Sequence, residues 1–177
     1  MNTYDELEVR QELPGDIDQI YTVNEAAFER ENEARLVSLL RSEIDFSTDL
    51  SFVAIKDEMI VAHVMFSTIT IRDEEGNEYT SLGLAPMSVL PGMQRLGIGS
   101  TLLKRALNRL IRMGYTSVFV LGHPDYYPRF GFRQSADFGI KTAFDIPEIA
   151  FMALELVPGS LRGVTGVAEY ASAFAEV

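Results

Sequence analysis

Apolar residues repeat with two different periods along this chain of 177 residues, and each period predicts its own kind of element. Leu7 and Val9 alternate with charged residues, as in a half-buried strand, and Pro14-Gly15-Asp16 then interrupts the pattern. Apolar positions at helical spacing follow over Ile17–Phe28, and again from about Glu33 to Ile44. The chain is therefore expected to begin with a strand and two helices.

The pattern from residue 52 to residue 89 predicts strands. Phe52–Ile55 and Ile60–Ile71 flank the polar turn Lys56-Asp57-Glu58, which predicts a hairpin. After a second polar turn, a further strand is expected from about Tyr79 to Val89.

The clearest helix lies after Pro91-Gly92. Its apolar positions repeat at helical spacing from Leu102 to Ile111, and Gly114 is expected to end it. Ser117–Leu121 is a short strand-like run, a short helix follows it, and Phe151–Val157 is the last expected strand. This order predicts an α/β fold with a mixed sheet rather than a regular βαβ array.

Length and composition favour a single domain that spans residues 1–177 and has a core large enough to fold without disulfides or structural metal ions. The chain has no cysteine, which excludes disulfides, cysteine metal sites and a cysteine nucleophile. His63 and His123 are the only histidines, so a three-histidine zinc site is excluded too, and we expect no metal. Residues 1–6 contain neither a basic nor an apolar segment, so we expect no signal peptide and a cytoplasmic location.

The formal net charge of −11 favours cationic partners over anionic ones. An acidic surface repels nucleic-acid phosphates and anionic membranes and attracts cations such as amines. The longest uncharged stretch, Leu82–Gln94, is too short to span a membrane. We therefore expect neither a nucleic-acid partner nor a membrane partner.

A glycine-containing turn joins the expected strand that ends at Val89 to the helix that follows. Backbone N–H groups at a helix start lack partners, and the absence of Cβ atoms at Gly97 and Gly99 lets an anion such as pyrophosphate approach them. Arg95 and Ser100 add a guanidinium and a hydroxyl. A plain turn is the alternative interpretation. A Rossmann fingerprint would need a third glycine, and a P-loop would need a Gly-Lys-Ser/Thr sequence.

Two motifs in this order resemble those of the GNAT N-acetyltransferase superfamily. Gln94–Gly99 matches its Q/R-x-x-G-x-G/A signature, and Tyr127–Phe132 resembles its Y-x-x-x-G-F element. The sequence of Leu121–Tyr127 is similar to that of the YhbS-like group of acetyltransferases. The resemblance covers about residues 7–157 and implies a mixed, mostly antiparallel, twisted sheet flanked by helices, the GNAT-like acyl-CoA N-acyltransferase fold. Residues 158–177 could complete the sheet, cover the acceptor site or contact a partner.

The resemblance also implies acetyl-CoA as cosubstrate and Tyr127 as the general acid, with Tyr126 as the neighbour most easily confused with it. A backbone N–H of the strand would polarise the thioester carbonyl, and the strand that ends at Leu121 should splay away to admit the thioester. The residues implied in cofactor binding are Met87, Ser88 and Val89 on the strand, Arg95, Leu96, Gly97, Ile98, Gly99 and Ser100 in the turn, and His123. Many relatives place an Asn near the last position, so for His123 an exposed turn residue stays an equal interpretation.

The general base is not assigned by this comparison. Some relatives carry an acidic or histidine side chain on the strand before the turn, whereas Thr80–Pro86 has no titratable group. The candidates are His63, Glu25, Glu33 and a water molecule. Because His63 lies among apolar residues, we favour a core histidine, and solvated carboxylates are ordinary at the two glutamates.

These observations predict an N-acetyltransferase in which a primary amine, from a small molecule or a peptide, attacks acetyl-CoA directly. The alternative is a non-catalytic acyl-CoA-binding sensor or regulatory module of the same fold, which the missing base favours. A different pyrophosphate-cofactor enzyme would require the Tyr127–Phe132 match to be accidental. Pairing into a homodimer stays open.

Overall fold

The computed structural model describes residues 7–177, and residues 1–6, where we expect no signal peptide, lie outside the described residues. The α-helices are α1 (Ile17–Phe28), α2 (Asn32–Arg41) and α3 (Ile98–Arg112). The strands are β1 (Glu8–Gln11), β2 (Ser51–Lys56), β3 (Met59–Arg72), β4 (Glu78–Val89), β5 (Ser117–Leu121), β6 (Arg133–Gln134), β7 (Ile140–Thr142), β8 (Phe151–Glu155) and β9 (Gly166–Glu169).

Hydrogen bonds order the strands β1-β2-β3-β4-β5-β8-β6, and β9 pairs with both β3 and β7. β1–β2, β2–β3, β3–β9, β5–β8 and β6–β8 are antiparallel, whereas β4–β5 and β7–β9 are parallel. The expected fold class, a mixed and mostly antiparallel sheet with helices, is confirmed. No helix within residues 7–177 is both long enough and apolar enough to cross a membrane.

The chain divides into two compact units. The first comprises Met1–Phe66, described from residue 7 on, with Pro86–Asn108 and Ser172–Val177; the second comprises Ser67–Ala85 and Arg109–Ala171. β3, β4 and α3 contribute residues to both units.

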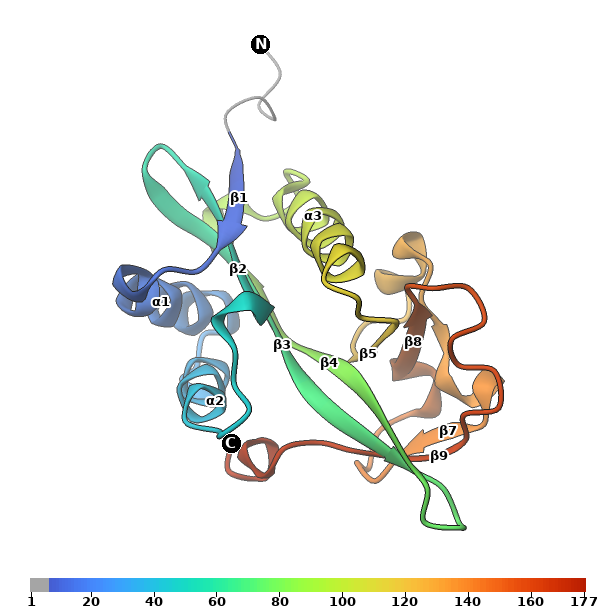
Figure 1. Ribbon diagram of the computed structural model, residues 1–177. Helices are drawn as coiled ribbons and strands as arrows, with labels where there is room; N and C mark the ends of the chain where they lie inside the picture. Colours follow the sequence, from blue (N-terminus) through green and yellow to red (C-terminus); the bar gives the residue numbers. More distant parts are fainter. Residues whose placement is uncertain (1–6) are drawn as a thin grey trace. The chain divides into compact units, whose positions relative to one another are not determined.

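In the first unit, α1 and α2 lie on one side of β1, β2 and β3, and α3 lies on the other (Figure 1). Ile20 of α1 and Leu40 of α2 are buried there, in keeping with the apolar faces expected for both helices. The hairpin of β2 and β3 is confirmed. Its turn residues Asp57 and Glu58 have φ angles of 49° and 63°, the left-handed conformation that suits a tight hairpin turn.

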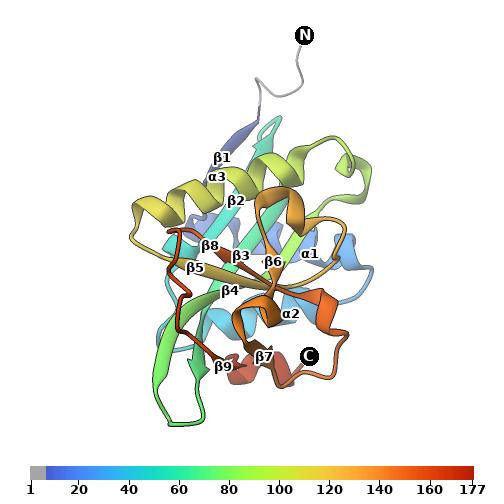
Figure 2. The same cartoon turned by 90° about the vertical axis from the view of Figure 1, so that its right-hand side faces the viewer.

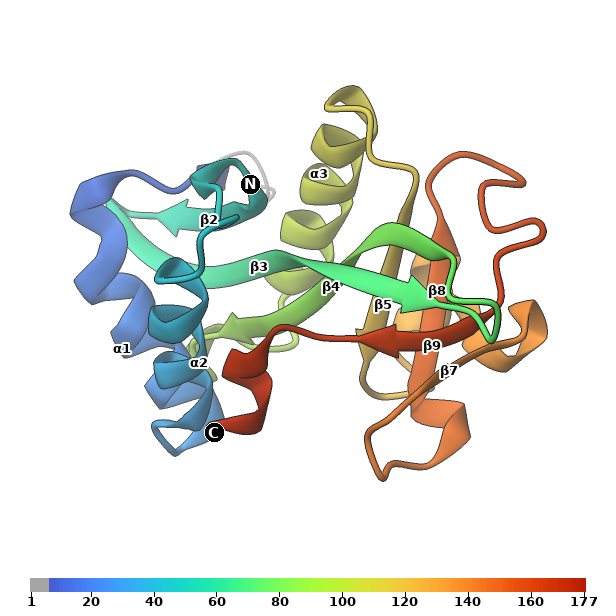
Figure 3. The same ribbon diagram turned by 60° about the horizontal axis from the view of Figure 1, so that its bottom comes forward.

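The end of α2 differs from the expectation. The apolar spacing predicts a helix to Ile44, but α2 ends at Arg41, and the Ser42 N–H already donates to the Leu39 carbonyl at 3.0 Å. Ile44 is fully exposed. The 3₁₀ helix η7 (Ser172–Ala175) at the chain end lies beside α2 (Figure 3).

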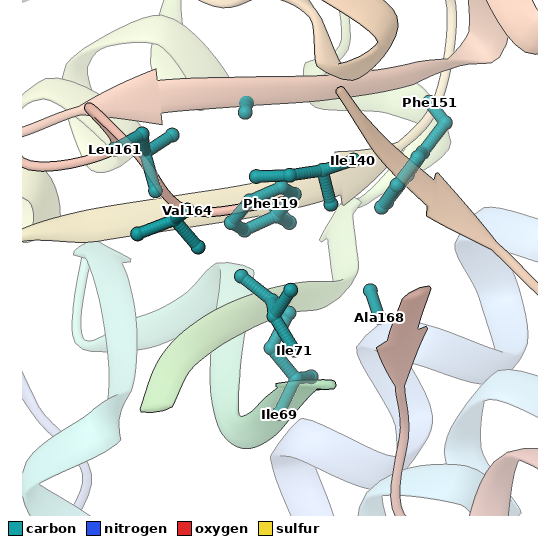
Figure 4. Packing of buried hydrophobic residues seen from close by; sticks show 9 residues of the cluster. Ile69, Ile71, Phe119, Ile140, Phe151, Leu161, Val164 and Ala168 are labelled. Atoms are coloured by element: carbon teal, nitrogen blue, oxygen red, sulfur yellow. The ribbon is translucent and has the colours of Figure 1, made fainter. Parts of the chain in front are cut away.

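In the second unit, β5 lies next to β8 (Figure 2), with Val120 opposite Met152. The buried core of this unit draws side chains from strands and loops distant in sequence (Figure 4). Its members are Ile69, Ile71, Phe119, Ile140, Phe151, Ala153, Leu161, Val164 and Ala168. β8 stops at Glu155, two residues before the expected end, because the next two backbone N–H groups donate to the Thr116 carbonyl at 2.8 and 3.2 Å. β9 shows that the C-terminal segment adds a strand.

Candidate functional site

The glycine turn lies in the first unit and is held by α3, which forms because apolar residues occupy one face. Leu102, Leu103, Ala106 and Leu110 are completely buried, which fixes how the helix packs. At its C-terminal end, Gly114 has a φ of 92° and donates to the Ile111 carbonyl at 3.1 Å, as expected for a helix-ending glycine.

Two residues of the turn have left-handed backbone conformations. The φ angle is 62° at Arg95 and 80° at Gly97. α3 begins at Ile98, and the Thr101 N–H donates to the Gly97 carbonyl at 3.0 Å. Because a helix offers no earlier carbonyl to its first amides, the N–H groups of residues 98–100 face outward at the positive end of the helix dipole. This end of α3 is suited to an anion.

The exposed turn is braced by Gln94. The Gln94 Nε2 donates to the Val89 carbonyl at 3.0 Å, which joins the turn to the last residue of β4. Arg95 and Leu96 are exposed, whereas Ile98 is buried against the unit. The turn is thus open to a ligand while its backbone is fixed.

The strand residues expected to bind the cofactor precede this turn. Met87 and Val89 are half-buried at the end of β4, and Ser88 is 3% exposed. The Ser88 hydroxyl has no hydrogen-bond partner in the part of the chain that the structure describes. A buried hydroxyl without a partner is costly, so it fits a place where a ligand group is bound.

Tyr127 lies in the second unit, at the first position of the 3₁₀ helix η4 (Tyr127–Phe130), and is 8% exposed. Its ring makes edge-to-face contacts with Tyr126 and Phe132, at centroid distances of 5.1 and 5.6 Å. Burial raises the pKa of the Tyr127 hydroxyl, and a coulombic contribution from Tyr126 adds to the shift. Tyr127 is therefore protonated at neutral pH, as a proton donor must be.

His123 is exposed just after β5 in the same unit. Its carbonyl accepts hydrogen bonds from the backbone N–H groups of Tyr126 at 3.1 Å and Tyr127 at 3.5 Å. His123 thus shapes the turn that carries Tyr127 through its backbone, and its side chain fits the interpretation of an exposed turn residue.

His63, one of the candidate bases, is completely buried in the first unit. Its Nδ1 lies 3.0 Å from the Asn24 Nδ2, and its Nε2 lies 2.9 Å from the Ser51 Oγ. Since the Asn24 amide is a donor there, Nδ1 accepts and the protonated Nε2 donates to Ser51. The Ser51 hydroxyl in turn donates to Glu12, whose carboxylate pairs with the Arg41 guanidinium at 2.7 Å.

Burial lowers the pKa of His63 to about 3, and the positive charge of Arg41 adds to this effect. With both ring nitrogens engaged and the ring sealed from solvent, His63 is a core histidine, as favoured from the sequence. Of the other candidate bases, Glu33 pairs with the Arg30 guanidinium and Glu25 is exposed on α1. No group of three or more metal-ligating side chains occurs among residues 7–177.

The structure thus assigns the expected residues to two units. Met87–Val89 and Arg95–Ser100 belong to the first, and His123 and Tyr127 to the second. Two features were missed from the sequence: the brace from Gln94 to Val89, and the close packing of Gly122 against the Tyr127 ring. Gln94 belongs to a recognised motif, but its hydrogen-bond partner depends on the path of the turn.

Comparison with known proteins bears on the family. A family model described as the acetyltransferase (GNAT) domain matches residues 8–135. The uncharacterized N-acetyltransferase YhbS of Escherichia coli (strain K12) is 34% identical over 163 residues, which are 92% of this chain and 95% of that protein. The uncharacterized N-acetyltransferase YjhQ of the same organism is 36% identical over 134 residues, which are 75% of this chain and 74% of that protein.

Solved structures agree with these matches. The structure of YhbS from Escherichia coli in complex with CoA has a TM-score of 0.88 and 32% identity, and the match covers 96% of this chain and 92% of that one. A GNAT family acetyltransferase from Brucella melitensis in complex with acetyl-CoA has a TM-score of 0.77 and 32% identity, covering 95% of this chain and 97% of that one. The resemblance read from the two motifs is confirmed: the chain belongs to the GNAT acetyltransferase family.

Proposed function

We propose that the protein is an acetyl-CoA-dependent N-acetyltransferase that acetylates a primary amine. The observation that carries the proposal is the glycine turn at the start of α3, in a chain 32% identical to one GNAT structure in complex with CoA and another in complex with acetyl-CoA. The turn alone would indicate only an anion site, and the similarity to the two solved structures names the cosubstrate, so the two observations support each other.

The residues present fit acetyl-CoA. The outward amides of residues 98–100 and the Arg95 guanidinium suit its pyrophosphate, because a helix N-terminus and an arginine both favour negative charge. The backbone of Met87–Val89 would bind the pantetheine arm, whose amides could satisfy the unpartnered Ser88 hydroxyl. Leu96, Ile98, Gly99 and Ser100 complete the proposed turn, and the exposed His123 is the proposed cofactor-binding residue of the second unit.

The chemistry needs no enzyme nucleophile. Acetyl-CoA supplies an acetyl group activated as a thioester, and the acceptor amine attacks it, so that a C–N bond forms and the C–S bond breaks. A backbone N–H in Met87–Val89 would stabilise the developing negative charge on the carbonyl oxygen. Tyr127 would donate its proton to the departing sulfur. The absence of cysteine from the chain agrees with direct attack.

The free-energy cost of proton transfer from Tyr127 to the CoA thiolate indicates how this residue would assist the reaction. A thiol has a pKa near 8.5 and a phenol one near 10, so full transfer costs about 2 kcal/mol with ordinary values. Burial raises the pKa of Tyr127 and increases that cost. A hydrogen bond from the hydroxyl to sulfur, which strengthens as charge develops there, offsets part of it. The hydroxyl thus acts chiefly by stabilising the leaving thiolate in the transition state.

The proton of the attacking ammonium must leave by another route. His63 is enclosed, and Glu33 is paired with Arg30. A water molecule or the exposed Glu25 remains as the base, and water is our choice because it requires no side chain near the amine. The net charge of −11 favours a cationic acceptor, either a small molecule or a peptide amine.

The proposal is tested by acetyl transfer to a panel of primary amines, such as spermidine, an aminoglycoside and a lysine peptide. The free CoA thiol is measured, and the acetylated product is identified by mass spectrometry. Tyr127→Phe should lower kcat by about 100-fold, the usual loss for a general acid, and leave the KM for acetyl-CoA nearly unchanged. Tyr115→Phe, the same change at another tyrosine of the second unit, is the matched control. Equal kcat values for wild type and Tyr127→Phe would contradict the acid role.

The second candidate is an acyl-CoA-binding sensor without turnover. The enclosure of His63 favours it, because it removes the one histidine that the sequence offered as a base. Binding of acetyl-CoA with no transfer to any amine of the panel would favour the sensor over the enzyme.

A further inference from the structure

We infer that Gly122 is a positioning residue for Tyr127: the missing side chain at residue 122 creates the space in which the Tyr127 ring lies. The inference rests on the proposed function for its catalytic consequence, since the Tyr127 hydroxyl is the proposed acid. The packing itself is observed within the second unit and is independent of that role.

The space next to Gly122 is filled by one edge of the tyrosine ring. A Cβ atom on Gly122 would lie 2.3 Å from the Tyr127 Cε2, 2.9 Å from its Cδ2 and 3.3 Å from its Cζ. Carbon atoms in favourable contact are about 3.5–4.0 Å apart. Even alanine at residue 122 would therefore overlap the ring, and the ring would have to move by about 1 Å or more.

Glycine is needed at this position for space and not for backbone conformation. The φ angle of Gly122 lies outside the left-handed region that favours glycine. Gly131, at the far end of η4, is the opposite case: its φ is 97°, which favours glycine whatever the space around it.

The clash could not be relieved by a small shift of the strand. The Gly122 N–H donates to the Ala150 carbonyl at 2.9 Å, directly after the pairing of Leu121 with Phe151. Tyr126 and Phe132 hold the ring by edge-to-face contacts, and Phe132 is 2% exposed. Because the sheet holds the backbone of residue 122, the ring would have to move against these two contacts, and its hydroxyl would move with it.

Such a displacement matters for a proton donor. A misplacement of about 1 Å in a catalytic geometry can cost about 100-fold in rate. Gly122→Ala should therefore lower kcat by about 10- to 100-fold while changing the KM for acetyl-CoA by no more than about twofold. In the Tyr127→Phe background the same substitution should cause little further loss of kcat, because the hydroxyl that it displaces is already gone.

A stability cycle on the unliganded protein tests the packing without any assay of activity. Thermal midpoints are measured for wild type, Gly122→Ala, Tyr127→Ala and the double variant. Gly122→Ala should lower the midpoint by several degrees in the wild-type background and by little once the ring is removed. The comparison of Tyr127→Ala with the double variant is informative even if Gly122→Ala alone does not fold.

The matched control is Gly83→Ala, in the same unit. A Cβ atom there would lie 2.8 Å from the ring of a different tyrosine, Tyr170, and 3.0 Å from the Ile69 Cγ2, so this variant should lose stability and keep kcat. The inference is overturned if Gly122→Ala keeps both the wild-type midpoint and the wild-type kcat. It is also overturned if the midpoint falls equally with and without the Tyr127 ring. Full activity of Tyr127→Phe together with the expected stability cycle would refute the acid role of Tyr127 and support the packing.

Discussion

At the scale of single residues, His63 is a buried core residue whose neutral state links folding to pH. Its ring is completely buried and bonded on both sides, to Asn24 of α1 and to Ser51 of β2. The chain of hydrogen bonds continues through Glu12 to Arg41 at the end of α2. The native state holds this histidine neutral, and that requirement makes stability depend on pH.

We predict that the free energy of unfolding falls as the pH decreases from 6.5 towards 4.5. In the unfolded chain His63 takes up a proton near pH 6.5, whereas in the native state its pKa is about 3, so the unfolded state binds more protons in this window. The slope should approach about 1.4 kcal/mol per pH unit. Urea unfolding at several pH values measures it.

Two histidine variants separate this effect from the rest of the chain. His63→Gln should be less stable than wild type at pH 7 but should show a flatter pH dependence down to pH 4.5. His123→Gln, at the exposed histidine, should keep the wild-type dependence. The hydrogen bond with Arg10 lowers the pKa of Asp16. The protein therefore loses the stability contributed by the Asp16 carboxylate only when the pH falls below the range in which His63 acts, as that carboxylate is protonated. A wild-type slope in His63→Gln would contradict the account.

At the scale of elements, α3 carries glycines with positive φ at both ends, for different reasons. Gly97 precedes the helix in the proposed pyrophosphate turn, with a φ of 80°, and Gly114 ends it, with a φ of 92°. Alanine in a left-handed conformation costs about 1–2 kcal/mol. Both alanine variants should therefore be destabilised by a similar amount.

The two variants should differ in cofactor binding. Gly97→Ala should weaken CoA binding about tenfold, equivalent to about 1.4 kcal/mol, because it distorts the turn that presents the α3 amides. Gly114→Ala should leave the dissociation constant for CoA unchanged. Isothermal titration calorimetry gives both constants. Equal affinities for the two variants would argue against a pyrophosphate site in this turn.

Elements with a strong period could be predicted from the sequence, and their ends could not. The β2–β3 hairpin and α3 follow directly from alternation and from a helical apolar face. The predicted end of α2 at Ile44 was wrong. Ile44 continues the spacing of Leu36 and Leu40, but the backbone leaves the helix at Ser42. β9 has only four residues, and its pairing with β3 and β7 depends on segments about 100 and 25 residues earlier in the chain.

At the scale of the whole molecule, the motifs specified the family but not the packing around the proposed acid. Gln94–Gly99 and Tyr127–Phe132 were sufficient to predict the GNAT family. That Gly122 packs against Tyr127 depends on how the turn after β5 folds back, and no spacing rule contains this information. The enclosure of His63 likewise depends on Asn24 and Ser51, which come from other elements.

The central claim, that the protein uses acetyl-CoA, is tested most directly by thermal unfolding with and without saturating acetyl-CoA, with CoA for comparison and NAD and ATP as controls. A ligand at 100 times its dissociation constant stabilises the native state by about 2.7 kcal/mol, which for a chain of this size raises the midpoint by roughly 5–10 °C. We predict this rise with acetyl-CoA and with CoA. No rise with acetyl-CoA, or a larger one with NAD or ATP, would contradict the account.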